Sequence, residues 1–412
     1  MYSAVYAALI CFLTYACIYA FRKPFTVGIY ENRPSYFGIA FKNLLVIAQV
    51  LGYTASKIFG VKFIAELKRV GRGKLILILV LMSWIPLLLF PLVPPPLGII
   101  CLFLNGLPLG ITWGIIFSFV EGRKATDFIG AALAVSFIVS SGVVKSIGKW
   151  LGVTFNLSEM WVPFYTGLLF FIPLILLVYG LEKIPAPTNE EVALKSERLP
   201  MTKMERVHFF KNFMPGLISF IFIYVVLTLF RDLRDNFAAD IWSNLGYANS
   251  ANVFTNTELP IAIIVLILIA SMILIKNNKA VFFISQYIVL VGFIIVGVST
   301  FLFQHNFING FNWMLLVGLG LYMGYIPFNS ILFDRMIATF RLKGNVGFLM
   351  YLMDSFGYFA SVLVIVVKGA AHIQLNWAQF YANGVFYFSI AGFMVSSFCI
   401  VYYIGKIKKL NL

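Results

Sequence analysis

Charged residues are scarce in this sequence of 412 residues, since Asp, Glu, Lys and Arg together make up 11% of it. An average soluble domain has roughly 25%. Acidic residues number 16 against 31 basic ones, and there are three histidines. So few charges exclude a soluble globular enzyme and a disordered chain. The four cysteines exclude a disulfide scaffold, and because all lie in apolar runs we interpret them as reduced packing residues.

Sequence motifs typical of enzyme active sites and nucleotide-binding sites are also absent. The sequence contains no H-E-x-x-H, no G-x-S-x-G and no clustered Asp/His motif on a loop. It has no G-x-x-x-x-G-K-[ST], which argues against transport driven by ATP within this chain. We therefore expect no enzyme, no cofactor, no catalytic residue and no metal site.

Apolar residues, in contrast, make up 61% of the chain, and aromatic residues 17%. A transmembrane helix needs about 20 apolar residues, so about 250 of them suffice for about twelve spans. The sequence predicts an all-α membrane protein with twelve transmembrane helices. The predicted spans are Tyr2–Phe21, Phe41–Phe63, Leu75–Leu92, Leu97–Val120, Phe128–Trp150, Trp161–Leu181, Phe213–Phe230, Leu259–Ile275, Ala280–Phe303, Phe311–Phe333, Val346–Val367 and Phe380–Ile404.

The long charged segment 182–211 divides the spans into two sets of six. We predict a six-helix half over 1–181, a cytoplasmic linker over 182–211 and a second six-helix half over 212–412. The end of the linker, 197–211, fits a short amphipathic helix on the membrane surface or an ordinary solvated segment. The Phe-Arg pair at Arg22 recurs at Arg231, and two pseudo-symmetric six-helix halves are the layout of major facilitator transporters.

The loops between the spans alternate in charge. One set of loops, including the linker and the C-terminal tail, holds 21 of the 31 cations, so the positive-inside rule predicts that both termini are cytoplasmic. The excess of basic residues is thus explained by membrane topology, and we expect no nucleic-acid partner. We expect a monomer in a lipid bilayer, most simply a bacterial inner (plasma) membrane. The opposite loops hold seven cations: Lys23, Arg33, Lys42, Lys145, Lys149, Arg234 and Lys368.

Four charged residues fall within or at the ends of spans: Arg22, Lys57, Arg231 and Asp354. Each costs about 2.5–3.5 kcal/mol near mid-bilayer, so such residues usually line a polar cavity. Arg22 and Lys57 are also compatible with snorkelling to the interface, and Arg231 with neutralisation by a nearby aspartate. Asp354 either pairs with a cation of another helix or titrates during a transport cycle.

The cations among these residues predict an anion site. Tyr15, Tyr19 and Arg22 have the spacing i, i+4 and i+7, which places two phenols and a guanidinium on one helical face. A guanidinium binds carboxylate or phosphate oxygens in a bidentate manner, and an ammonium adds a point charge. Three cations and one acid in a cavity therefore favour a small organic anion that carries phosphate or carboxylate.

The segment from Tyr15 to Phe25 has the pattern Y-x-x-x-Y-x-x-R-K-x-F, and Tyr53 to Lys57 has Y-x-x-S-K. In these motifs, and in the Arg231 region with Trp242, the sequence resembles the organophosphate:phosphate antiporters of the major facilitator superfamily. The resemblance implies that Arg22 and Arg231 are paired phosphate ligands, that Lys57 adds charge, and that Tyr15 and Tyr19 line a central cavity. It also implies alternating access with phosphate exchange, and a first helix that extends past Pro24.

The chain departs from that family in ways that mark a divergent member. The fifth span has no histidine over 136–144, Asp354 replaces a small residue, and further charges follow Arg231. A secondary transporter of a small organic anion is the first interpretation, with the coupling by exchange or by protons left open. The alternatives are a proton-coupled carrier of another small solute that uses Asp354, and a membrane ligand sensor that does not transport.

Overall fold

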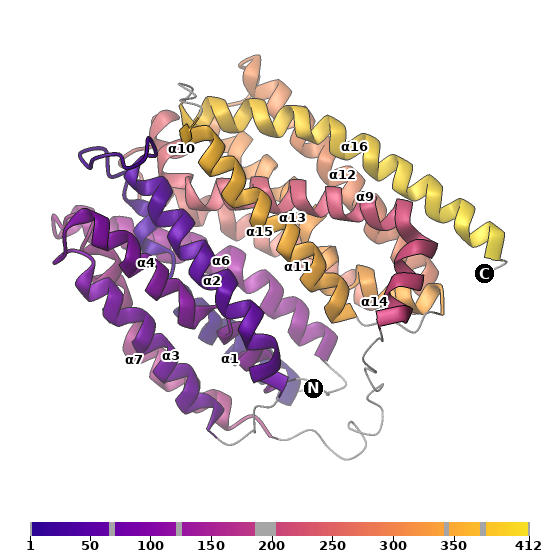
Figure 1. Ribbon diagram of the computed structural model, residues 1–412, viewed down its shortest axis with the longest axis horizontal. Coiled ribbons are helices and arrows are strands. Elements are labelled where there is room, and N and C mark those ends of the chain that lie inside the picture. Colours follow the sequence, from indigo (N-terminus) through magenta and orange to yellow (C-terminus); the bar gives the residue numbers. More distant parts are fainter. Residues whose placement is uncertain are drawn as a thin grey trace. The chain divides into compact units, whose positions relative to one another are not determined.

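The computed structural model describes residues 2–65, 71–120, 126–185, 203–341, 346–370 and 376–410, and all its named elements are helices (Figure 1). Each of the first six predicted spans coincides with one helix or with two consecutive helices. They are α1 (Tyr2–Tyr19), α2 (Phe41–Ala65), α3 (Arg72–Leu89), α4 (Pro95–Leu109) with α5 (Thr112–Phe117), α6 (Thr126–Thr154) and α7 (Val162–Glu182); a short 3-10 helix, η1 (Pro24–Val27), follows α1.

The last six predicted spans agree with helices in the same way. Nine helices among the described residues are long and apolar enough to cross a membrane. The prediction of an all-α membrane protein is therefore confirmed. The helices are α9 (Lys203–Asn236), α11 (Val253–Ile273), α12 (Asn278–Gln304), α13 (Gly310–Ser330) with α14 (Leu332–Thr339), α15 (Val346–Ala370) and α16 (Trp377–Leu410), and the short α10 (Ala238–Asn244) follows α9.

Several helix boundaries differ from those that the sequence predicts. Two spans are broken in two shortly after an internal proline, Pro108 near the end of α4 and Pro327 near the end of α13. Proline lacks the N–H that bonds to the carbonyl four residues before it, which weakens the helix there, although α3, α7, α9 and α11 continue through internal prolines. The first helix does not extend past Pro24, because α1 ends at Tyr19 and the chain turns before η1. Residues 203–211 of the predicted linker form the first turns of α9.

Glycines allow two pairs of helices to approach closely. A Cβ atom added to Gly52 of α2 would lie 2.2 Å from the backbone oxygen of Phe103 in α4. In α12 and α13, a Cβ on Gly292 or on Gly320 would lie 2.5 Å from the carbonyl oxygen of the other glycine. Small residues at such crossings let backbones touch, which is how membrane helices gain van der Waals contact where there is no hydrophobic driving force.

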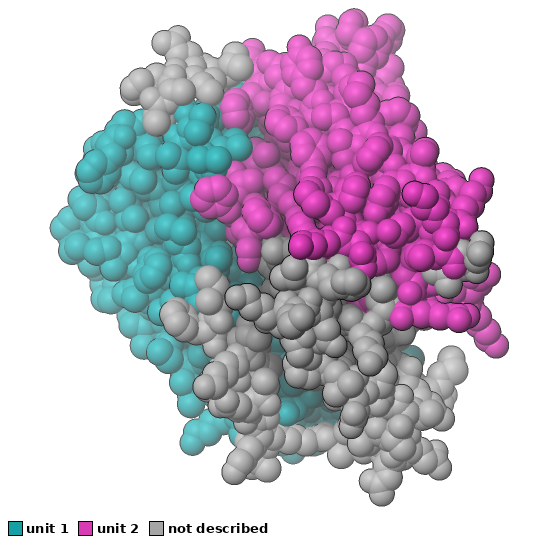
Figure 2. Space-filling view, turned by 45° about the vertical axis from the view of Figure 1, so that its right-hand side comes forward, with its two compact units in different colours: residues 1–194, 235–262, 362–377 teal, residues 195–234, 263–361, 378–412 magenta. Residues whose placement is uncertain are grey.

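The contacts divide the chain into two compact units, shown in teal and magenta in Figure 2. Unit 1 comprises residues 1–194, 235–262 and 362–377, and unit 2 comprises residues 195–234, 263–361 and 378–412. Unit 1 therefore contains two segments from the second half of the sequence. The functional division into 1–181, 182–211 and 212–412 stays a prediction.

Candidate functional site

In unit 1, Arg22 lies in the turn after α1 and contacts the faces of two tyrosine rings. Its Cζ atom is 3.8 Å from the ring centroid of Tyr53 in α2 and 5.8 Å from that of Tyr19. The Nζ atom of Lys57, one helical turn beyond Tyr53, is 5.2 Å from the same Tyr53 ring. A guanidinium and an ammonium thus share one aromatic ring through cation–π contacts. Two of the predicted site cations come together here.

Buried amides hold the turn that carries Arg22. The backbone N–H of Arg22 donates to the carbonyl of Tyr19, 3.0 Å away. The carbonyl of Arg22 accepts from Gln49 Nε2 at 2.8 Å, and that of Phe21 accepts from Asn105 Nδ2 at 2.8 Å. The last carbonyls of a helix have no partner within it, so these side chains satisfy oxygens that would otherwise be buried without a hydrogen bond. The turn, and with it Arg22, is therefore fixed by α2 and α4.

The predicted tyrosine face of α1 is present. The rings of Tyr15 and Tyr19 are 5.3 Å apart in an edge-to-face arrangement, and both residues are buried. Tyr15 also shares a side-chain hydrogen bond with Tyr53. Sequence reasoning did not assign Tyr53 a role, although its spacing of four residues from Lys57 places both on one face of α2. The group of Tyr15, Tyr19, Arg22, Tyr53 and Lys57 is called the unit 1 cation site below.

In unit 2, Arg231 of α9 stacks on Tyr325 of α13, with its Cζ atom 3.9 Å from the ring centroid. Its Nη2 and Nε atoms donate to Asp232 Oδ1 at 2.6 and 3.2 Å. The other carboxylate oxygen, Asp232 Oδ2, accepts from the hydroxyl of Ser361 in α15 at 3.1 Å. Asp232 is thus the nearby aspartate that neutralises Arg231.

Asp354 of α15 accepts a hydrogen bond from the hydroxyl of Tyr224 in α9. The Tyr224 oxygen is also 3.2 Å from the hydroxyl of Tyr325 and 3.4 Å from Asn329 Oδ1. A hydrogen-bonded tyrosine pair thus links Asp354 to the ring on which Arg231 stacks. Tyr224, Tyr325 and Asn329 had no role in the sequence-based site, because that site was chosen from the charged residues within the spans.

A second charged cluster in unit 1, the lysine cluster, consists of Lys23, Lys145 and Asp235. Asp235, at the end of α9, forms ion pairs with both lysines, and Lys145 Nζ is 2.5 Å from Asp235 Oδ1. Lys23 also donates to Asn236 Oδ1 at 2.8 Å. Lys23 and Lys145 are only 5% and 3% exposed, so these two cations are buried rather than in solvated loops. Burial lowers the pKa of Lys23 to about 8, although Asp235 opposes this shift.

Two further cations assigned to loops are buried as well. Lys42, at the start of α2, is 2.5 Å from Asp240 Oδ2 in α10 and 3.1 Å from the carbonyl oxygen of Thr26. In unit 2, Arg234 of α9 donates through Nη2 to the carbonyl of Met314 at 3.0 Å. The charge of Lys42 is therefore balanced by a carboxylate, and Arg234 is held by hydrogen bonds to a backbone carbonyl.

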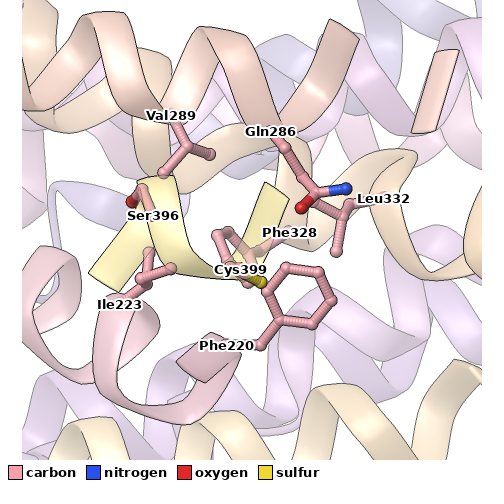
Figure 3. Close-up of a pocket in the computed structure, with 8 residues that line it drawn as sticks. All are labelled: Phe220, Ile223, Gln286, Val289, Phe328, Leu332, Ser396 and Cys399. Carbon is pink, nitrogen blue, oxygen red and sulfur yellow. The ribbon is translucent and has the colours of Figure 1, made fainter. Parts of the chain in front are cut away.

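A small cavity in unit 2 lies between α9, α12, α13, α14 and α16, with Gln286 and Ser396 on its lining (Figure 3). It offers about 10 Å³ to a water-sized molecule, which is too small for an organic solute. Within the described chain, both polar atoms of the Gln286 side chain and the Ser396 hydroxyl have no hydrogen-bond partner. The described residues also contain no group of three or more His, Cys, Asp or Glu arranged to hold a metal ion.

The profile of a family described as "Family of unknown function (DUF5690)" matches residues 24–406. No curated protein is significantly similar in sequence. Among solved structures, the chain is similar to a D-xylose-proton symporter, with a TM-score of 0.60 and 14% identity over 97% of both chains. It is also similar to the nucleoside transporter NupG, with a TM-score of 0.59 and 15% identity over 98% of this chain and 99% of the other. The predicted twelve-helix fold of major facilitator transporters is confirmed.

Proposed function

This chain belongs to the DUF5690 family, and we propose that it is a secondary transporter that moves a small organic anion across a membrane. The observation that carries the proposal is an arginine stacked on a tyrosine ring in each unit. The separations are 3.8 Å for Arg22 on Tyr53 and 3.9 Å for Arg231 on Tyr325. The two solved structures are named as a symporter and a transporter of small solutes, which supports transport as the activity.

Stacking suits a guanidinium to anion binding. The flat face rests on the aromatic ring, while the N–H groups lie in its plane and donate to oxygens, often two at a time. Arg231 illustrates this geometry, because two of its nitrogens donate to one carboxylate oxygen of Asp232. The phosphate or carboxylate oxygens of a solute offer the same acceptors. We therefore propose Arg22 and Arg231 as anion ligands, one in each unit.

Lys57, Tyr15 and Tyr19 complete the proposal in unit 1. Lys57 adds a second positive charge beside Tyr53, and the buried phenols of Tyr15 and Tyr19 offer hydroxyl donors and apolar ring faces to the organic part of the solute. A phosphate ester meets both demands, since it combines a concentrated negative charge with a small organic body. We propose this substrate class, with both termini in the cytoplasm as the loop charges predict.

Transport assays in proteoliposomes test the proposal. The purified protein is reconstituted and challenged with radiolabelled phosphate esters, carboxylates, inorganic phosphate, a neutral sugar and a nucleoside. We expect uptake of at least one anion, and loss of its uptake and binding in both Arg22→Ala and Arg231→Ala. Arg33→Ala is the matched control, because Arg33 is exposed in the segment after η1 and is expected to have no effect.

Three outcomes would contradict the proposal in different ways. Uptake of a neutral solute that is unchanged in both arginine variants would show a carrier of another kind. Binding of an anion without any uptake would favour a ligand sensor on the same fold. Normal anion transport by both variants would remove the arginines from the site.

A further inference from the structure

A groove between α9 and α16 opens on the surface of unit 2. It offers about 460 Å³ and is lined by three residues of each helix: Ile218, Ser219, Phe222, Met394, Val395 and Phe398. Ser219 is the one polar residue of this lining, and its hydroxyl donates to the carbonyl of Pro215 at 2.9 Å. The groove therefore offers apolar surface and no free hydroxyl hydrogen, which suits a hydrocarbon chain.

The two helices are in close contact at one end of this groove. A Cβ atom added to Gly216 of α9 would lie 2.5 Å from the ring of Tyr403 in α16. One turn nearer the start of α9, the Nζ atom of Lys406 donates to the carbonyl of Asn212 at 2.8 Å and is 5.1 Å from the ring centroid of Phe213. These contacts fix Lys406 beyond the end of the groove. Because an ammonium carries three hydrogens, Lys406 can also donate to an anion.

Three lysines share helix faces with the groove. Each lies seven or eleven residues from lining residues of its own helix: Lys211 from Ile218 and Phe222, Lys406 from Val395, and Lys409 from Phe398. Seven and eleven residues make about two and three turns, so each lysine returns to the face of the lining residue. Lys211 and Lys409 are exposed, and α16 contains no acidic residue. This end of the groove is therefore positively charged.

The distance between the lysines and the groove fits one half of a bilayer. Each residue of an α-helix adds about 1.5 Å along the axis, so seven and eleven residues correspond to about 10 and about 16 Å. Half of the hydrocarbon core is about 15 Å thick. Lysines at the membrane surface therefore place the groove among the acyl chains of the same leaflet. The loop charges predict that this leaflet is the cytoplasmic one, which carries anionic lipids.

We propose that unit 2 binds an anionic phospholipid here, with one acyl chain in the groove and the phosphate group on Lys211, Lys406 and Lys409. The site does not depend on the proposed anion transport. A phospholipid matches both features, because its chain begins at the charged headgroup and extends into the leaflet. A second copy of the protein fits less well, since a two-fold contact would bring the same lysines together. A free anion matches the lysines and leaves the groove empty.

Native mass spectrometry of the purified, delipidated protein tests the headgroup contacts. Phosphatidylglycerol and phosphatidylcholine with identical acyl chains are added in equal amounts, so that the headgroup is the only difference. We expect a preference for phosphatidylglycerol that falls about fivefold for each lysine lost in Lys406→Gln and Lys409→Gln, and that is kept in Lys409→Arg. Lys276→Gln is the control, because Lys276 is exposed between α11 and α12 of the same unit. Equal binding of both lipids, or an unchanged preference in Lys406→Gln/Lys409→Gln, overturns the proposal.

The groove is tested separately by filling it. Ile218→Trp/Met394→Trp adds a bulky ring to each helix at exposed positions of the lining. We expect this variant to bind less phosphatidylglycerol although all three lysines remain. Ile267→Trp is the control, because Ile267 is 65% exposed on α11 of unit 2. Unchanged phosphatidylglycerol binding in the double variant contradicts an acyl chain in the groove.

Two further measurements distinguish the lipid from other occupants. Inorganic phosphate at the concentration of the lipid is expected to leave the phosphatidylglycerol adduct in place, because it has no chain to fill the groove. Displacement of the lipid by phosphate would show a site for a free anion. A protein dimer that forms without lipid and is lost in Ile218→Trp/Met394→Trp would show an interface between two copies. Either result overturns the lipid site.

Discussion

Asp235 gives the sharpest test of how the charges are held in unit 1, because a single carboxylate balances two buried lysines. In Asp235→Asn, Lys23 and Lys145 both lose their counter-charge, while the shape of the side chain is kept. Removal of one partner from a buried ion pair costs about 3–5 kcal/mol, since the remaining charge stays in a medium of low polarity. With two ammonium groups left behind, we expect a loss at the upper end of this range.

The same geometry predicts a smaller effect when a lysine is removed. Lys145→Met deletes one of the two cations and leaves Lys23 and Asp235 as a neutral pair. The variant loses a charge-assisted hydrogen bond, worth about 1.5–3 kcal/mol, and gains the relief of repulsion between the lysines. Asp240→Asn removes the carboxylate that pairs with Lys42 and also acts on Lys368 at longer range, and its effect is expected to fall between the two.

The free energy of unfolding is measured by titrating SDS into mixed micelles and following tryptophan fluorescence. The triple variant Asp235→Asn/Lys23→Met/Lys145→Met, in which no buried charge of the lysine cluster remains, is expected to regain most of the loss. If Lys145→Met destabilises as much as Asp235→Asn, or if the triple variant is no more stable than Asp235→Asn, the cluster is not held by its charge balance.

Three further predictions concern pH, a buried amide and a helix crossing. The pKa of Lys23 is about 8 in the fold, against an ordinary value of 10.5. Between pH 8 and 10.5 the unfolded chain therefore binds more protons than the folded chain. Over this range the melting temperature of the wild type should rise with pH relative to that of Lys23→Met. Gln286→Leu removes a buried amide that has no hydrogen-bond partner in the described chain. Because such a group costs about 1–3 kcal/mol of stability, the variant should have a higher melting temperature. A large destabilisation would contradict this prediction. Gly52→Ala should lower stability by about 1–3 kcal/mol because of the nearby Phe103 oxygen, whereas Gly405→Ala, with no atom within 4 Å, should not.

The fold follows from the sequence because twelve long apolar runs have few alternatives to twelve helices. The boundaries follow less well where charges lie inside a helix. The seventh predicted span ends at Phe230, yet α9 continues to Asn236. The hydropathy pattern ends the span at Arg231, because a hydropathy value reflects only how well a residue type partitions into lipid. It does not include the hydrogen bonds that Arg231 donates to Asp232 and Arg234 donates to the Met314 carbonyl. The eighth span shows the same effect at its start, since α11 begins at Val253, six residues before the predicted Leu259.

The charged members of the candidate site were predictable, and their partners were not. Arg22, Lys57, Arg231 and Asp354 stand out because a charge inside an apolar run is costly. Tyr325, in contrast, lies 94 positions from Arg231 in the sequence, inside a run of Gly, Leu and Tyr residues that gives no sign of a contact. Asp354 was expected either to pair with a cation of another helix or to titrate during a transport cycle; the structure shows its hydrogen bond to Tyr224, and both roles stay predictions.

The burial of four cations also changes the argument on membrane orientation. The loops opposite the basic set contain seven cations by sequence, but Lys23, Lys42, Lys145 and Arg234 are each at most 5% exposed and have partners within the fold. The positive-inside rule concerns charges in loops that face the membrane surface, so these four do not oppose it. Arg33, Lys149 and Lys368 are then the cations left to these loops, and the cytoplasmic placement of both termini stays a prediction. Because these four residues are buried, the net charge of +15 does not describe the charge of the protein surface. Part of it is internal, where it holds helices together instead of setting orientation.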